Sequence, residues 1–185
     1  MAGFNLDLSQ GSSDHNGKLE TFSVDASHTT ILAPGDVVVL TGTSDSNGVA
    51  GADAAAQGAA MTGVIAGVEP AFVGENLTET GVAAETAGKV RCHVDPNLNF
   101  IVSVTDGPLT AADVGLNADA DVTAASKSGG LTVSNMSLDA STKATDAELQ
   151  FRIVGLAPNK AGEIDGLTAR VRINNSTMRA GAAGV

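Results

Sequence analysis

The chain has 185 residues, of which 21 are acidic and 10 basic, so its formal net charge is −11. Nucleic acids and anionic membranes bind proteins largely through lysine and arginine, so we expect neither as a partner. The chain holds five Phe but no Trp or Tyr, which argues against sugar binding and against stacking with single-stranded bases. One cysteine excludes an intrachain disulfide and a thiolate metal cluster.

Residues 1–20 are polar and lack hydrophobic periodicity, so we expect an N-terminal arm. Two interpretations are open: a disordered terminus, or an arm that becomes ordered on a neighbouring subunit. The first residues lack the basic and apolar regions of a signal peptide, and no stretch has the length of a membrane span. We therefore expect a protein that is used without secretion.

Short apolar runs punctuated by Gly, Ser, Thr, Asn and Asp follow, a pattern typical of strands joined by turns. Phe22 and Val24 are expected on one face of a strand, and 37–40 should be a strand buried on both sides. We expect 43–60, which is almost entirely small residues, to be a long surface loop or a loop with a short Ala helix. Residues 61–68 predict a buried strand whose glycines indicate a bulge or a close backbone approach.

Four later segments alternate between apolar and polar residues, which predicts strands with one buried and one exposed face. The residues expected inside are Val90, Cys92, Val94, Leu98, Phe100, Val102, Val104, Leu149, Phe151, Ile153, Ala169, Val171 and Ile173. Those expected outside are Lys89, Arg91, His93, Gln150, Arg152, Arg170 and Arg172. The sequence therefore predicts an all-β fold, an antiparallel sandwich or barrel (a jelly roll included), over 21–175, with a small-residue tail over 176–185.

The histidines and the cysteine suggest no catalytic site. His15 lies in the arm, His28 in a turn and His93 on the outer face of a strand. Cys92 and His93 are adjacent, and neighbours on a strand point to opposite faces, so they cannot form a catalytic pair. We interpret Cys92 as a buried small apolar residue. No catalytic residue, cofactor or enzymatic activity is predicted; a hydrolase using clustered acids is the enzymatic alternative, but no carboxylate pair can be singled out.

A metal site is not predicted either, although two segments contain closely spaced residues with oxygen ligands. The first begins like a calcium loop with Asp45 and Asn47, but places Val49 where an oxygen ligand should stand and lacks the closing Glu. No fixed ligand spacing supports the second, "ADVGLNADAD", which contains three aspartates; these are Asp113, Asp119 and Asp121.

We interpret "ADVGLNADAD" as a turn-rich loop beside a strand. Asp113 can cap a short turn, and Gly115 and Asn117 allow the backbone to reverse direction. Acidic side chains in such loops are more often solvated than metal-bound.

Four of the ten basic residues fall on outward strand positions, whereas the acids fall mostly in loops and turns. These four are Arg91, Arg152, Arg170 and Arg172. The arrangement has two interpretations: a solvated sheet face, or a face that docks on an acidic partner through bidentate arginine–carboxylate contacts. On the second interpretation, reversing Arg170 and Arg172 to Glu weakens association.

Three segments together resemble the decoration, or cement, proteins of tailed-bacteriophage capsids. They are "ADVGLNAD" at 112–119, "LDASTKATDAELQFRIVGL" at 138–156 and a closing strand "VRIN" at 171–174. The earlier "APGDVVVLTG" is similar to the first strand of small phage head proteins. The resemblance covers the C-terminal half of the chain best, and no catalytic motif anchors it.

The resemblance implies an all-β protein on the outer surface of the phage head that binds the major capsid protein and stabilises the shell. It also implies a homo-oligomer, with a trimer favoured slightly over a dimer, that assembles in the host bacterial cytoplasm. The family supplies no catalytic residues to carry over. A receptor-binding or fibre-type β module is the alternative, although the lack of Trp and Tyr argues against a sugar ligand.

Overall fold

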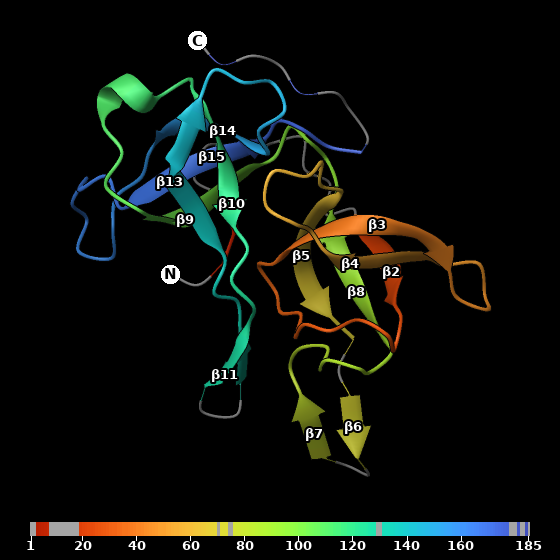
Figure 1. Ribbon diagram of the computed structural model, residues 1–185. Helices are drawn as coiled ribbons and strands as arrows, with labels where there is room; N and C mark the ends of the chain where they lie inside the picture. The colour runs from red at the N-terminus through yellow and green to blue at the C-terminus, as the bar shows by residue number, and fades with distance from the viewer. Residues whose placement is uncertain are drawn as a thin grey trace.

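The computed structural model describes residues 3–7, 19–69, 71–73, 76–128, 131–177, 181 and 184, and these form an all-β protein. Their only helical segment is a three-residue 3-10 turn, η1 (Ala111–Asp113), so no helix in this part of the chain is able to cross a membrane. The strands close into two barrels that lie side by side (Figure 1). The predicted all-β class is therefore confirmed.

The first barrel contains five strands, and its order β2-β4-β3-β5-β8 closes on itself. The strands are β2 (Glu20–Val24), β3 (Val37–Ser44), β4 (Ala50–Ala54), β5 (Gly63–Val68) and β8 (Gly88–His93). Strands β2 and β4 are parallel and all other neighbours are antiparallel.

The second barrel also contains five strands, in the order β9-β13-β10-β14-β15, and pairing of β15 with β9 closes it. The strands are β9 (Asn99–Thr105), β10 (Asn117–Asp121), β13 (Ser137–Ala144), β14 (Phe151–Leu156) and β15 (Thr168–Ile173). Strands β9 and β13 are parallel, whereas the other neighbours are antiparallel. A short strand β1 (Asn5–Leu6) adds to β9 beside β13.

Two hairpins extend beyond the barrels on the same side (Figure 1). One consists of β6 (Ala71–Val73) and β7 (Asn76–Glu79), the other of β11 (Ser126–Ser128) and β12 (Leu131–Val133). Thr80, which follows β7, contacts β12, because the backbone N–H of Thr132 donates to Oγ1 of Thr80 at 2.6 Å. The second hairpin is thereby fixed to the first barrel as well as to its own.

The second barrel repeats the topology of the first. In each, the strands follow the order first, third, second, fourth, fifth, and the parallel pair is the first with the third. Gly35 donates to the carbonyl of Ile65 as Gly115 donates to that of Ile153, and these glycines have φ of 95° and 100°. Residues 21–40 therefore align with 101–120 without a gap, and the fold is an internal repeat.

The repeat extends to an irregularity in the fourth strand of each barrel. A bulge falls between Ile65 and Gly67 in β5 and between Ile153 and Gly155 in β14. Each of these glycines lies opposite an arginine of the fifth strand, Gly67 opposite Arg91 and Gly155 opposite Arg170. Arg91 and Arg170 are thus equivalent positions. The bulge expected from the glycines of 61–68 is confirmed.

Most of the predicted inward positions are buried. Phe22 and Val24 join Val38, Val90 and Cys92 inside the first barrel. The second core contains Leu98, Phe100, Val102, Val104, Phe151, Ile153, Ala169, Val171 and Ile173. The first half of strand β3, residues 37–40, is covered on both sides as predicted, since Val37 belongs to the second core and Val38 to the first; residues 41–44 are exposed. Val94 is partly buried, and Leu149 is half-buried just before β14.

Three local expectations were wrong. Residues 43–60 do not form one long loop, because β4 lies within them and completes the first barrel. The "NADAD" end of the turn-rich segment is strand β10, four of whose residues are buried. Gln150 was expected outside but is fully buried. In each case small or polar side chains occupy buried positions where bulkier apolar residues would be the usual signal.

The two barrels meet in a packed junction that includes Gln150. Val37, Ala55, Met61 and Val64 of the first barrel belong to the core of the second. Gln150 accepts from the backbone N–H of Ala120 at 2.9 Å. Its Nε2 donates to the carbonyl oxygens of residues 56 and 59 in the β4–β5 loop, at 3.0 and 2.9 Å. This buried amide therefore joins the two barrels with every polar atom satisfied.

Residues 3–7 of the predicted arm lie on the chain's own second barrel, whereas Glu20 begins strand β2 of the first. Phe4 stacks on Phe151 with ring centroids 4.4 Å apart, and the N–H of Asp7 donates to the carbonyl of Asn99. Residues 1–2 and 8–18 of the arm, His15 included, lie outside the described residues. Of the tail, Ser176 forms a parallel bridge with Met61.

Candidate functional site

Three of the four arginines singled out in the sequence gather on one outer face of the second barrel. Arg152 of β14 and Arg172 of β15 are directly opposed cross-strand partners. Arg170 lies two positions along β15 from Arg172, on the same face. We call Arg152, Arg170 and Arg172 the arginine face. Arg91 lies on the other barrel, at the position equivalent to Arg170, and is exposed.

Neighbouring amides hold two of these arginines. Nε of Arg172 donates to Oδ1 of Asn99 at 3.1 Å, and Nε of Arg152 donates to Oδ1 of Asn117 at 3.4 Å. An amide oxygen fixes a guanidinium without neutralising its charge. Because both side chains are half-buried and held, little conformational entropy is lost when their outer N–H groups meet a ligand.

Arg170 has a different environment, because it forms an ion pair with Asp7. The Asp7 side chain is fully buried and that of Arg170 is 17% exposed. The pair ties the N-terminal segment to β15, so the role of Arg170 in the isolated chain is structural. The contacts of Arg152 and Arg172 differ from this one, because Nε of each donates to a neutral amide oxygen.

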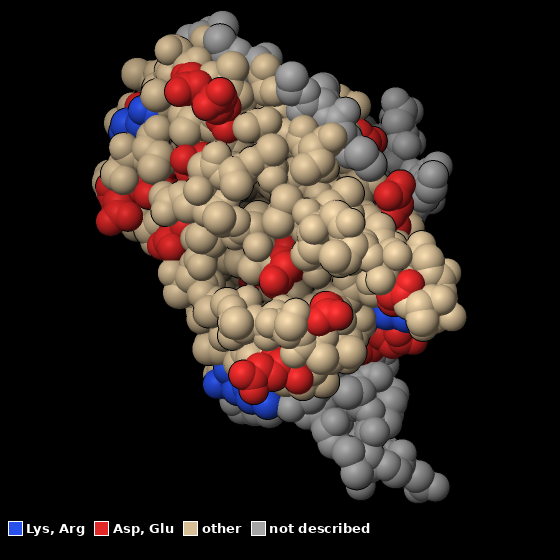
Figure 2. Space-filling model, turned by 45° about the vertical axis from the view of Figure 1, so that its right-hand side comes forward, with Lys and Arg blue, Asp and Glu red and all other residues tan. Residues whose placement is uncertain are grey.

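Charge on another side of the molecule is distributed differently. Figure 2 shows acidic side chains as separate spots on a largely uncharged surface, with the few Lys and Arg near its edges. In a chain of net charge −11, a cluster of three arginines is therefore a distinct local feature.

The "ADVGLNADAD" segment is a capped turn followed by a strand. Asp113 accepts from the backbone N–H and the hydroxyl of Thr110, at 2.7 and 2.9 Å, and forms an ion pair with Lys143. The hydrogen bonds from Thr110 hold the pKa of Asp113 below its usual value. The capping role predicted for Asp113 and the reversal at Gly115 are confirmed, whereas Asn117 begins strand β10.

Asp119 of this segment faces the junction. Its Oδ1 accepts from the backbone N–H of Gln150 at 3.1 Å, and it pairs across the sheet with Asp139. Burial raises the pKa of Asp119. Nowhere in the part of the chain that the structure describes do three His, Cys, Asp or Glu side chains come close enough to share a metal ion.

Asp45, in the other candidate loop, organises a hairpin turn. Its Oδ1 accepts from the backbone N–H groups of Asn47 and Val49, at 2.9 and 2.8 Å. The hydrogen bonds from Val49 and Asn47 hold its pKa below the usual value. The turn connects β3 to β4 and thereby places β4 in the barrel wall.

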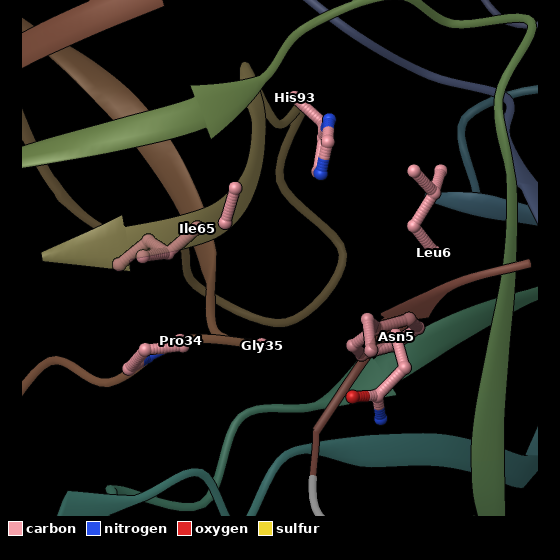
Figure 3. A pocket seen from close by; sticks show the side chains of 8 residues that line it. Asn5, Leu6, Pro34, Gly35, Ile65 and His93 are labelled. Carbon is pink, nitrogen blue, oxygen red and sulfur yellow. The ribbon is translucent and has the colours of Figure 1, made fainter. Parts of the chain in front are cut away.

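Cys92 and His93 point to opposite sides of β8, as the sequence predicts. Cys92 is fully buried, and burial raises the pKa of its thiol to about 12, which makes it a poor nucleophile. His93 points into a pocket of about 210 Å³ between β8 and the N-terminal strand (Figure 3). None of the described residues that line this pocket has a carboxylate, hydroxyl or thiol side chain.

The sequence pattern missed two features of the site. Gln150 was missed because the alternation of the strand predicts an outward side chain at this position. In the structure Gln150 precedes β14, and its side chain is buried in the junction. The internal repeat has a faint signal: "FSV" and "VSV" align at 22–24 and 102–104, and "IAGV" of β5 aligns with "IVGL" of β14. Comparison of the chain with family models, curated proteins and solved structures gives no match.

Proposed function

We propose that this protein is a bacteriophage head decoration protein that binds the outer surface of the capsid and bridges neighbouring major capsid subunits. The observation that carries the proposal is the opposed pair Arg152 and Arg172, held on a rigid barrel wall of an otherwise acidic chain. Pre-positioned arginines suit bidentate contacts with carboxylates of a protein partner.

The rest of the architecture suits a binding role. Two barrels joined through one packed core form a stiff body that can span two subunits, and many weakly bound copies on a shell gain avidity. The resemblance of 112–119, 138–156 and 171–174 to cement proteins points the same way. We further propose that the protein acts as a homo-oligomer, with a trimer favoured over a dimer.

Co-sedimentation with empty phage heads that lack their decoration protein tests the proposal. We expect saturable binding at a fixed ratio of copies to capsid subunits. Arg152→Glu with Arg172→Glu should weaken binding at least about tenfold, since each reversal places like charges against the acidic partner. Light scattering of the free and detached protein gives the oligomeric state.

Arg91→Glu is the control, because it makes a single charge reversal of the same kind on the exposed equivalent strand of the other barrel. Its binding should stay close to that of the unmodified protein. Failure of the unmodified protein to sediment with heads, or equal losses in the Arg91 and the Arg152/Arg172 variants, would overturn the proposal.

A further inference from the structure

A buried carboxyl group lies where the N-terminal segment, residues 3–7, meets the first barrel. Asp36, the residue before β3, is fully buried, and its Oδ2 accepts the backbone N–H of Ala33 at 2.7 Å. Its Oδ1 is also buried and has no hydrogen-bond partner among the described residues. Because a charged carboxylate that leaves water needs such partners, this position suits the neutral, protonated form of the side chain.

The surroundings of Asp36 do not compensate the charge that it acquires on ionisation. Burial raises its pKa from 3.8 to about 6, and the opposing causes are neutral groups, the Ser134 hydroxyl and the backbone of Ala33. In the described part of the chain, no charged side chain contributes to this shift. Ionised Asp36 is therefore a buried charge without a counter-charge, which makes the surrounding contacts less stable.

The N-terminal segment rests on two immediate neighbours of this carboxyl, Gly35 and Ser134. The backbone N–H of Phe4 donates to the carbonyl oxygen of Gly35 at 2.9 Å. Gly3 packs so closely that a Cβ at this residue would lie 2.5 Å from Oγ of Ser134 and 2.8 Å from the carbonyl oxygen of Gly35. A change at Asp36 that displaces Gly35 or Ser134 therefore reaches residues 3 and 4 directly.

The pocket of about 210 Å³ beside His93 borders the same contact, and both Phe4 and Gly35 line it. Figure 3 shows His93 and Gly35 on opposite sides of this space. The hydrogen bond between Phe4 and Gly35 thus faces a cavity instead of close-packed side chains, so the two residues can separate without displacing the core.

We propose that Asp36 is a proton switch for the N-terminal segment: the protonated side chain keeps residues 3 and 4 in contact with Gly35 and Ser134, and loss of the proton loosens that contact. The loosened arrangement is favoured because it gives the charged carboxylate access to water. The stability of the closed contact is complete below pH 3.8 and is lost as the pH rises through about 6. This inference goes beyond the capsid-binding function and is independent of it.

Hydrogen exchange measured by nuclear magnetic resonance on the full chain tests the inference through the backbone N–H of Phe4. Its protection factor, which corrects for the effect of pH on the intrinsic exchange rate, should fall by up to about tenfold between pH 5 and pH 8. This is the ratio expected when the carboxyl of Asp36 regains a pKa of 3.8 in the loosened arrangement. The carbon-13 signal of the Asp36 carboxyl should titrate over the same range.

Three variants separate Asp36 from other titratable groups. Asp36→Asn keeps the shape of the side chain but cannot ionise, so the protection factor of Phe4 should be the same at both pH values. Asp119→Asn removes a second buried acid whose pKa is raised, and His93→Gln removes the imidazole beside Phe4. Both of these variants should retain the fall.

Asp7 and Arg170 are the other charged groups at the segment, and they pair at its far end. Asp7→Asn should lower the protection of Phe4 by a similar factor at both pH values. An unchanged protection factor while Asp36 titrates, the same fall in Asp36→Asn, or loss of the fall in His93→Gln would overturn the inference. Should Asp36→Asn fail to fold, the match or mismatch between the Asp36 titration and the Phe4 change in the unmodified chain decides it.

Discussion

The two barrels share a backbone plan but not a set of side chains. Both have a left-handed glycine at the start of the second strand, Gly35 and Gly115, and both have the bulge in the fourth. The cores differ: among the residues whose burial the structure describes, the first core contains Phe22 as its one aromatic residue, whereas the second contains Phe4, Phe100 and Phe151. The second core also takes in apolar residues from the outside of the first barrel, so the first depends on the second for stability.

The outer positions of the barrels have diverged further. His93 and Arg172 are equivalent, as are Val64 and Arg152. Val64 is buried at the junction, whereas Arg152 lies on the free side of the second barrel. The comparison shows that one barrel wall became an internal contact while its copy became an arginine-bearing surface. Substitutions in one barrel, or at the junction between the two, test how the barrels differ.

The largest expected effect is on the second core. Phe151→Ala removes a fully buried ring that stacks on Phe4, and should lower the free energy of unfolding by about 3–5 kcal/mol. Urea unfolding followed by far-ultraviolet circular dichroism measures it, because the chain lacks Trp and Tyr. Ile164→Ala, at a residue 67% exposed, is the control and should change stability by no more than about 0.5 kcal/mol.

Next in size is the junction amide. Gln150→Leu leaves the N–H of Ala120 and two loop carbonyls without their partner and should cost about 2–4 kcal/mol. Calorimetry should then resolve two transitions, because the loop that joins the barrels is released. Gln57→Ala is the control: this exposed side chain donates a hydrogen bond to Asp139, and one cooperative transition should remain when it is removed. A single transition in Gln150→Leu would show that apolar contacts alone couple the barrels.

A buried acid distinguishes the barrels electrostatically, since Asp36 of the first aligns with Leu116 of the second. Burial, opposed by hydrogen bonds with Ser134 and Ala33, raises the pKa of Asp36 from 3.8 to about 6. A raised folded-state pKa gives stability that is complete below pH 3.8 and is lost as the pH rises through 6. Asp36→Asn should therefore be more stable than the unmodified chain at pH 8 by about 3 kcal/mol.

The same variant should show almost no gain at pH 4, where Asp36 is largely protonated in the folded protein. Urea midpoints at the two pH values give the difference directly. Equal gains at both values would assign the effect to packing and not to ionisation.

The smallest expected effect concerns the N-terminal segment. Asp7→Asn removes the carboxylate that pairs with Arg170, and should lower stability by about 1–2 kcal/mol because Arg170 keeps partial contact with water. Glu163→Gln, at an exposed loop position, controls for the loss of one negative charge. Hydrogen exchange at β9 should rise in the first variant alone, since β1 pairs there.

The sequence predicts the fold class well because strand alternation depends on burial, which local pattern records. Phe100, Val102 and Val104 alternate with exposed or half-buried neighbours and are found inside, as expected. Strands β4 and β10 escape prediction because "AGADA" and "NADAD" carry small or polar residues at buried positions. Their place in the barrels is set by long-range pairing, which overrides local propensity.

The candidate site could be predicted from the sequence only in part. Alternation identifies Arg152 and Arg172 as outward residues, but only the register of β14 with β15 makes them neighbours. The same pattern cannot separate Arg91 from Arg170, because only the contact with Asp7, from the other end of the chain, distinguishes them.

The closure of the second barrel by the pairing of β9 with β15 has a consequence for synthesis on the ribosome. The strands of the first barrel all emerge before those of the second, whereas β9 must wait for β15 at residues 168–173. Until then, Phe4, Val37 and Met61 lack the core that buries them in the finished protein. A nascent chain that pauses in this interval exposes apolar surface, so trigger-factor-type chaperones should matter most late in translation.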